Sequence, residues 1–180
     1  MIQLFTELQE KKNVRSNLSA LRASLKEATE EQKAQAIEFV RGHEDLVFGF
    51  LQEEDAKTRK NAALLLGDLA VQNALQPLWK AYTREQTLFV KSAYLEAMKA
   101  LHAEEILSQL KDRFAELEGE PVTEENRKHR EAELRALRAI LIQYEGIDTH
   151  HFDIKQKNNH VLLVTNRNHR GILENQTGGK

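Results

Sequence analysis

The sequence predicts a mainly α-helical fold built from helical hairpins, and three observations support this. The chain has only 8 glycines and 2 prolines in 180 residues, far fewer than the turns of an all-β fold require. Apolar residues recur at helical spacing along most of its length; one such stripe runs through Val14, Leu18, Leu21 and Leu25. The third observation is an internal repeat, in which one segment in the middle of the chain matches the next with an offset of 32 residues.

Capping residues mark where two of the helices begin. Thr29 and Gln32 have the spacing of a capping box, in which each side chain accepts a hydrogen bond from the other residue's backbone N–H. We therefore expect a helix over Glu30–Gly42. Further along, Thr123 predicts the start of a long helix that reaches about Glu145.

The repeat covers two successive helices and the turn between them. Moving Thr58–Tyr82 by 32 positions places Arg59 on Lys91 and Leu78 on Leu110. The repeating unit is therefore a helical hairpin of the length that helical solenoids use. A helix pair this short cannot bury its apolar stripe alone, so we expect each unit to stack on its neighbours.

The first helix of this unit resembles that of a HEAT or armadillo repeat. The run Asp55–Leu69 is acidic, then basic, then alanine-rich, and ends in Leu-Gly-Asp-Leu. The resemblance covers roughly Asp45–Glu118 and implies a HEAT-like α-α superhelix, in which the second helix of each pair lines the concave surface. HEAT repeats serve many unrelated tasks, so the resemblance predicts a fold and not a function.

The composition changes at Gly146. The chain up to that point carries a net charge of −4 and the remainder +2, within a total of −2. Two short segments, 150–154 and 161–165, predict strands joined by a turn at 157–159. We therefore expect a helical-repeat domain over residues 1–145. Residues 146–180 are expected to form a short α+β appendage with a β-hairpin, interpreted as the start of a truncated second domain.

Composition also excludes several classes of protein. The chain has no cysteine, which rules out disulfides, cysteine-ligated zinc and a thiol nucleophile. Its longest apolar run, Ala62–Gly67, is too short to span a bilayer, and residues 1–11 lack the features of a secretory signal. We therefore expect a cytoplasmic protein with no membrane partner. A net charge of −2 and a pI near 6.4 argue against tight, sequence-specific DNA binding.

No catalytic or metal-binding motif is found. The sequence has no glycine-rich phosphate loop, no G-x-S-x-G elbow and no G-x-G-x-x-G fingerprint. The single pair His43-Glu44 supplies too few ligands for an iron site. The histidines near the C-terminus lack ligand spacing and are interpreted as solvated strand ends; they are His150, His151, His160 and His169. We therefore expect no metal or cofactor in this chain, and the sequence leaves open whether it is part of an enzyme.

The candidate binding residues of the helical part are Trp79, Lys80, Arg84 and Lys111. Core packing is the ordinary interpretation of Trp79, but the residue aligns in the repeat with Lys111, a polar position, which makes a place at the surface almost equally compatible with the sequence. Exposed tryptophans are frequent anchors of protein interfaces. Tyr82, in contrast, aligns with Phe114 and is expected in the core. The cations around Trp79 make this surface mildly basic.

Two other groups of charged residues have more than one interpretation. The equivalent pair Arg59 and Lys91 suits a basic ladder for an anionic partner, but pairing with acidic neighbours such as Asp55 or Asp68 is favoured. A charged run on the later helix combines Arg127, Lys128, Arg130, Arg135 and Arg138 with Glu124, Glu125, Glu131 and Glu133. Opposite charges three or four residues apart stabilise an exposed helix, so this run is interpreted as a solvated face.

Several segments taken together resemble the N-terminal region of bacterial proteins in which a helical-repeat segment precedes an S-adenosylmethionine-dependent RNA methyltransferase domain. The segments are Asp55–Leu69, Phe89–Leu95, Glu124–His129 and Val161–Arg170. In that family the last segment opens an RNA-engaging module. The resemblance makes Arg167, His169 and Arg170 candidates for phosphate contacts, although an ordinary solvated strand end is the favoured interpretation. The glycine-rich cofactor loop and the Asn/Asp-Pro-Pro-aromatic element are missing, so S-adenosylmethionine is expected only with a further domain.

The sequence thus predicts a non-catalytic helical-repeat scaffold that recognises protein or RNA, as the N-terminal arm of an RNA methyltransferase. The alternative is a stand-alone HEAT-repeat module for protein interaction. A HEAT-repeat nucleic-acid enzyme such as a DNA glycosylase is disfavoured. It would need a strongly basic groove with a central aromatic residue and a carboxylate, for which Trp79 and Asp112 are the only candidates.

Overall fold

The computed structural model describes residues 2–144, 152–157 and 160–165, with side chains as far as residue 144. The chain divides into two compact units, Met1–Leu141 and Ile142–Lys180, and each is described by itself. The described residues of the first unit form α-helices joined by short 3₁₀ turns and loops. The prediction of a mainly helical protein is therefore confirmed.

The helices of the first unit are α1 (Ile2–Gln9), α2 (Val14–Lys26), α3 (Glu30–Gly42), α4 (Glu44–Gly49), α5 (Ala56–Asp68), α6 (Leu75–Arg84), α7 (Leu88–Ala100), α8 (Leu107–Gly119) and α9 (Arg127–Leu141). Three short 3₁₀ turns accompany them: η1 (Phe50–Gln52), η2 (Gln72–Ala74) and η3 (Glu104–Ile106).

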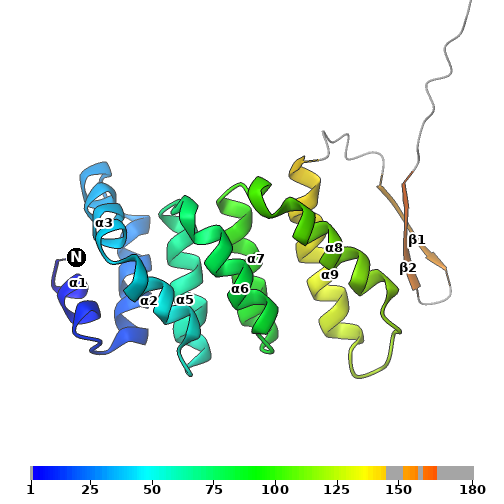
Figure 1. Ribbon diagram of the computed structural model, residues 1–180, viewed down its shortest axis with the longest axis horizontal. Coiled ribbons are helices and arrows are strands. Elements are labelled where there is room, and N and C mark those ends of the chain that lie inside the picture. The colour runs from blue at the N-terminus through cyan, green and yellow to red at the C-terminus, as the bar shows by residue number, and fades with distance from the viewer. Residues whose placement is uncertain (1, 145–151, 158–159, 166–180) are drawn as a thin grey trace, which may run out of the picture. The chain divides into compact units, whose positions relative to one another are not determined.

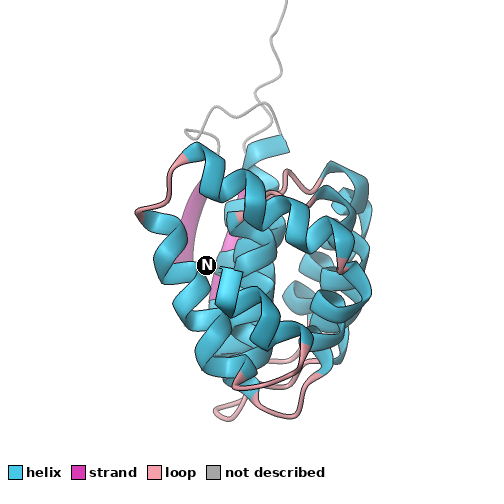
Figure 2. Cartoon of the chain, turned by 90° about the vertical axis from the view of Figure 1, so that its left-hand side faces the viewer, coloured by secondary structure: helices cyan, strands magenta, loops and turns pink. Residues whose placement is uncertain are grey.

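These helices form two layers. In one layer α2, α5, α7 and α9 stand side by side, each in contact with the next (Figure 1). The second layer includes α6, which packs against α7, and α8, which packs against α9. Figure 2 looks along the row from its N-terminal end and shows the two layers with loops above and below. All four helices of the first layer begin at the same edge, the lower edge of Figure 1.

Local capping explains where two helices begin. The Thr29 hydroxyl accepts a hydrogen bond from the Gln32 N–H at 3.2 Å, and the Gln32 side chain accepts one from the Thr29 N–H at 3.0 Å. This capping box and the bounds of α3 confirm the prediction. Thr123 also acts as a cap: it exchanges reciprocal bonds of 2.8 and 3.2 Å with Asn126, and its carbonyl accepts from the Arg127 N–H at 3.0 Å. These bonds close one turn, which the prediction counted as part of the helix. The helix α9 begins after that turn, at Arg127, and ends at Leu141.

The element bounds show the same 32-residue offset as the sequence. Both α5 and α7 contain 13 residues, and α7 begins and ends 32 positions after α5. The turns η2 and η3 are also 32 positions apart. Ala70 and His102, which are equivalent in this register, both adopt left-handed backbone conformations, with φ of 52° and 53°. The two chain reversals are thus built alike.

The core lies between the layers and consists mainly of leucine, alanine and aromatic side chains. Among the largest fully buried side chains are Phe50, Leu66, Leu78, Tyr82, Tyr94 and Met98. The helices α5 and α7 approach each other closely at Gly67. A Cβ atom on Gly67 would lie 2.9 Å from the Ala97 Cα, which is too close for any side chain.

The second unit contains two strands, β1 (Phe152–Lys157) and β2 (His160–Thr165). They pair antiparallel, with Phe152 opposite Thr165 and Lys157 opposite His160. The candidate phosphate-contact residues Arg167, His169 and Arg170 lie outside the described residues. In the described part of the chain, every helix is too short or too polar to cross a membrane.

Candidate functional site

An open pocket beside α6 contains three of the residues predicted to bind a partner. It has a volume of about 840 Å³ and takes its walls from η1, α5, α6 and α7. Trp79, Lys80 and Arg84 line it, whereas Lys111 lies at an exposed position on α8 and does not border it. We refer to this space as the α6 pocket.

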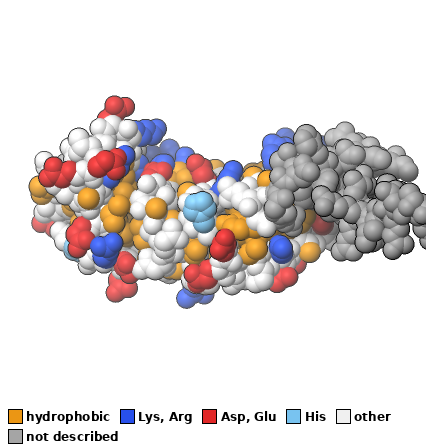
Figure 3. Space-filling model, turned by 90° about the horizontal axis from the view of Figure 1, so that it is seen from above, with side chains coloured by type: hydrophobic (Ala, Val, Ile, Leu, Met, Phe, Trp, Pro, Cys, Tyr) orange, Lys and Arg blue, Asp and Glu red, His pale blue; other side chains and the backbone are white. Residues whose placement is uncertain are grey.

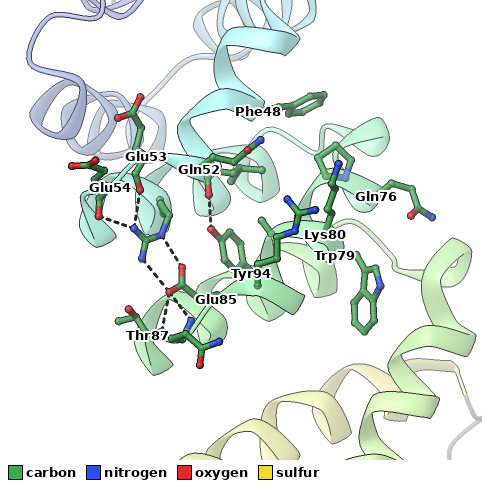
Figure 4. A pocket seen from close by; sticks show the side chains of 16 residues that line it. Phe48, Gln52, Glu53, Glu54, Gln76, Trp79, Lys80, Glu85, Thr87 and Tyr94 are labelled. Carbon is green, nitrogen blue, oxygen red and sulfur yellow. Dashed lines mark hydrogen bonds and ion pairs between the residues drawn. The ribbon is translucent and has the colours of Figure 1, made fainter.

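One wall of the α6 pocket is a largely buried ion pair. The Arg59 Nε donates to the Glu85 carboxylate at 2.7 Å, and a second guanidinium nitrogen donates to the other carboxylate oxygen at 3.0 Å. The two side chains are only 17% and 5% exposed. The remaining guanidinium nitrogen donates to the backbone carbonyls of Glu53 and Glu54, both at 2.8 Å (Figure 4). Arg59 therefore ties the start of α5 to two separate loops.

Glu85 also holds the start of α7. Its carboxylate accepts hydrogen bonds from the backbone N–H groups of Gln86 at 3.0 Å and Thr87 at 2.8 Å. Burial by itself would raise the pKa of Glu85. The Arg59 guanidinium and the bonds from Thr87 outweigh burial, and the pKa lies below its usual value. The carboxylate is thus charged at neutral pH. It fixes the loop before α7 directly, and it fixes the loop before α5 through Arg59.

The open part of the pocket has an acidic side and a side with cations and an indole. Figure 4 shows Glu53 and Glu54 on one side, with Gln76, Trp79 and Lys80 on the other. Trp79 is partly exposed, and its ring lies 5.2 Å from that of Tyr82. The pocket therefore offers an apolar surface flanked by charges of both signs.

Arg59 and Lys91 each pair with an acidic residue, as the favoured interpretation predicts. The expected partners, Asp55 and Asp68, were wrong. Asp55 instead accepts hydrogen bonds from the Thr58 N–H and hydroxyl at 2.7 and 2.8 Å, and so caps α5. Asp68 pairs with Arg22 of α2 at 2.7 Å. Both aspartates are near in sequence but are engaged elsewhere.

Lys91 pairs with Glu133 of α9, and this carboxylate also contacts side chains of α6 and α8. Lys91 lies 3.2 Å and the Arg113 Nε 3.1 Å from the Glu133 carboxylate, and the Tyr82 hydroxyl donates to it as well. Glu133 is 6% exposed, so the interpretation of this residue as part of a solvated face was wrong. Burial by itself would raise its pKa, but Tyr82, Lys91 and Arg113 together hold the pKa below its usual value.

Tyr82 is buried, as the repeat register predicts. Burial and the neighbouring Glu133 carboxylate raise its pKa, so the hydroxyl stays protonated and can donate. The group of four side chains is a structural connection between α6, α7, α8 and α9. Sequence reasoning missed this group because Glu133 lies far along the chain from its partners, 42 residues after Lys91 and 51 after Tyr82.

The other surfaces of the described residues show no arrangement for metal chemistry. No three His, Asp or Glu side chains in this part of the chain come together in a way that would hold a metal ion. Figure 3 looks onto the edge opposite to the helix starts of the first layer, where acidic and basic side chains are mixed. Comparison with protein-family models, curated proteins and solved structures finds no match for the chain.

Proposed function

We propose that the protein is a non-catalytic, HEAT-like helical-repeat scaffold that recognises a protein partner through the α6 pocket. The HEAT-like architecture is supported by the shared 32-residue offset of α5 with α7 and of η2 with η3. It is also supported by the two layers, in which the second helix of each hairpin packs on the first layer. On this proposal α6 lies on the concave surface.

The observation that carries the proposal is a partly exposed tryptophan on a pocket whose loops are already fixed. Hydrogen bonds from Arg59 and to Glu85 hold the backbone on both sides of the pocket. A partner then binds without first ordering these loops, which lowers the entropic cost of association. Trp79 supplies the kind of anchor on which protein interfaces rely.

The charges of the pocket favour protein over RNA as its ligand. Glu53 and Glu54 border the same space as Lys80 and Arg84. A phosphate backbone that approached the two cations would also approach the two exposed carboxylates, and like charges repel. A peptide segment with an apolar side chain between acidic and basic residues matches both sides.

A photo-crosslinking experiment tests the proposal. The residue p-benzoylphenylalanine replaces Gln76, an exposed residue of the pocket, or Gln35, an exposed residue of α3 that serves as the matched control. We expect a defined protein to crosslink from position 76 and not from position 35. That protein, once purified, should bind Trp79→Ala at least about tenfold more weakly than the wild type at a temperature where circular dichroism shows both to be folded.

Two results would count against a protein-binding pocket. One is crosslinking of the same molecules from both positions. The other is undiminished binding of the purified partner by the Trp79→Ala variant. Crosslinking of RNA alone from position 76 would support recognition of RNA in place of protein.

A narrower proposal is that this scaffold is the cytoplasmic, N-terminal arm of an RNA methyltransferase. It is supported by the resemblance of the four sequence segments alone, and a stand-alone interaction module is the alternative. The crosslinked protein distinguishes the two. A methyltransferase subunit, or an RNA-modifying complex that contains one, would favour the arm, whereas a partner of another class would favour the stand-alone module.

A further inference from the structure

A second groove lies at the edge of the first unit where the helices of the first layer begin. It has a volume of about 920 Å³ and is lined from the starts of α2, α5 and α7. Its charged and aromatic residues are Arg15, Lys57, Lys60 and Phe89, and we call it the basic groove. The groove is separate from the α6 pocket, with which it shares no lining residue.

The basic groove is positive although the chain as a whole is slightly acidic. None of the described residues that line it is Asp or Glu; the remaining ones include Ser16 and Asn61. Arg15 lies 3.9 Å from the Asp55 carboxylate, and the two side chains are 55% and 47% exposed. A contact this long and this exposed neutralises little charge. The same Asp55 carboxylate also interacts electrostatically with Lys57, although neither Lys57 nor Lys60 has a carboxylate of the described residues within 4 Å.

The helix starts add to this potential. Unbonded N–H groups in the first turn of a helix carry partial positive charge. Neither α2 nor α7 has an acidic residue in its first turn or a side-chain hydrogen bond at its N-cap. The partial charge at the start of α2 is therefore not compensated by a capping side chain. At the start of α7 the Glu85 carboxylate accepts from the Thr87 N–H and offsets part of it.

Phe89 gives the groove an exposed aromatic face. It is the second residue of α7 and is 48% exposed; among the large apolar side chains of the described residues, only Ile2 is also exposed. A solvent-exposed phenyl ring among cations does not contribute to the core. It does match the way single-stranded nucleic acids are bound, with phosphates on cations and a base stacked on an aromatic ring.

We propose that the basic groove binds single-stranded nucleic acid. Phosphates contact Arg15, Lys57 and Lys60, and an unpaired base stacks on Phe89. A duplex does not fit this arrangement, because its bases are stacked on one another and expose no face to the ring. An acidic peptide would satisfy the cations but would not use the ring, so Phe89 separates the two ligands. The inference does not depend on the protein partner of the α6 pocket.

Fluorescence anisotropy with labelled oligouridine and oligothymidine of about 12 nucleotides tests the proposal, at about 50 mM salt. The double variant Lys57→Ala/Lys60→Ala removes two cations from the groove. Its matched control is Lys26→Ala/Lys99→Ala, which removes the same charge from exposed positions at the opposite ends of α2 and α7. We expect the groove variant to bind at least about tenfold more weakly than the control, and the slope of log K against log salt to fall by about 1.4.

The ring is tested by two substitutions of Phe89. We expect Phe89→Leu, which stays apolar, to lose about fivefold or more in affinity, and Phe89→Tyr, which keeps a stacking face, to bind like the wild type. Circular dichroism on every variant controls for loss of fold. Any of three results would overturn the proposal: no binding of either oligonucleotide, equal losses in the two lysine variants, or displacement by polyglutamate with Phe89→Leu unaffected.

Discussion

The Tyr82 hydroxyl donates a hydrogen bond to the Glu133 carboxylate and so connects α6 to α9 across 51 residues of sequence. Lys91 and Arg113 contact the same carboxylate from α7 and α8. Four helices therefore meet at one charged group that water barely reaches. Such a carboxylate contributes to stability only while it is ionised, because both cations would otherwise be left without a counter-charge.

Substitution of Glu133 by glutamine should therefore lower the free energy of unfolding in a pH-dependent way. At pH 7 we expect a loss of about 2–3 kcal/mol, less than for a fully buried pair because Lys91 and Arg113 keep some exposure to water. The pKa of Glu133 is lower in the folded protein than in the unfolded chain. Its stabilisation is thus present above the unfolded pKa of about 4.3 and is lost as the pH falls through the folded pKa.

Urea unfolding at several pH values between about 7 and 3 measures this effect. The difference between the wild type and Glu133→Gln should shrink as the wild-type carboxylate becomes protonated. Glu131→Gln, at an exposed position of the same helix, is the control and should stay within about 0.5 kcal/mol of the wild type. A difference that is constant with pH would show that the charge of Glu133 does not matter.

The second prediction concerns Arg59, whose guanidinium makes four hydrogen bonds to three residues. Lysine keeps the charge but cannot reproduce this planar arrangement of donors. We expect Arg59→Lys to lower the free energy of unfolding by about 1–3 kcal/mol, because buried acceptors lose their partners. Arg41→Lys is the matched control, since Arg41 pairs with Glu38 while both are about 70% exposed; equal losses in the two variants would contradict the role given to Arg59.

The third prediction concerns the close approach of α5 and α7 at Gly67. Alanine is a better helix former than glycine by about 1 kcal/mol, so propensity alone would make Gly67→Ala stabilising. The added Cβ would lie 2.9 Å from the Ala97 backbone, however, and the two helices must move apart. We expect a net loss of about 1–2 kcal/mol in thermal or urea unfolding.

Gly49→Ala controls for the propensity term in this experiment. Gly49 is helical, with φ of −58° and ψ of −35°, and nothing lies within 4 Å of its added Cβ. This variant should be as stable as the wild type or slightly more stable. If both glycine variants gained stability, the helix contact at Gly67 would not be as tight as the structure has it.

Local and periodic features of this protein were predictable from the sequence. The capping box of Thr29 and Gln32 depends on residues three apart, and the buried position of Tyr82 follows from its register with an apolar residue one repeat later. The first signal is local to one turn, and the second is carried by the 32-residue period of the sequence. Thr123 caps the turn before α9, as its sequence position predicts, but the regular helix begins one turn later, at Arg127.

The partners of the buried charges were not predictable from local sequence. Glu133 stands among other charged residues of α9 and has the spacing of an exposed helix face, although tertiary contacts bury it. Glu85 follows the end of α6 and gives no sign that it will meet Arg59, 26 residues earlier. The basic groove was missed for the same reason, since its cations come from two helices and the net charge of the chain conceals them.

The row of helices in the first layer also governs how the molecule opens. Its main contacts run from α2 to α5, from α5 to α7 and from α7 to α9, so each helix is supported chiefly by the next one along. Segments at the ends of such a row lose protection against amide hydrogen exchange before the middle does. We therefore expect α5 and α7 to exchange most slowly. Both the α6 pocket and the basic groove are built partly on these two helices, and α9 lines neither of them. Local opening of α9 can therefore proceed while both proposed binding surfaces stay intact, whereas opening of α2 at the N-terminal end removes Arg15 from the basic groove.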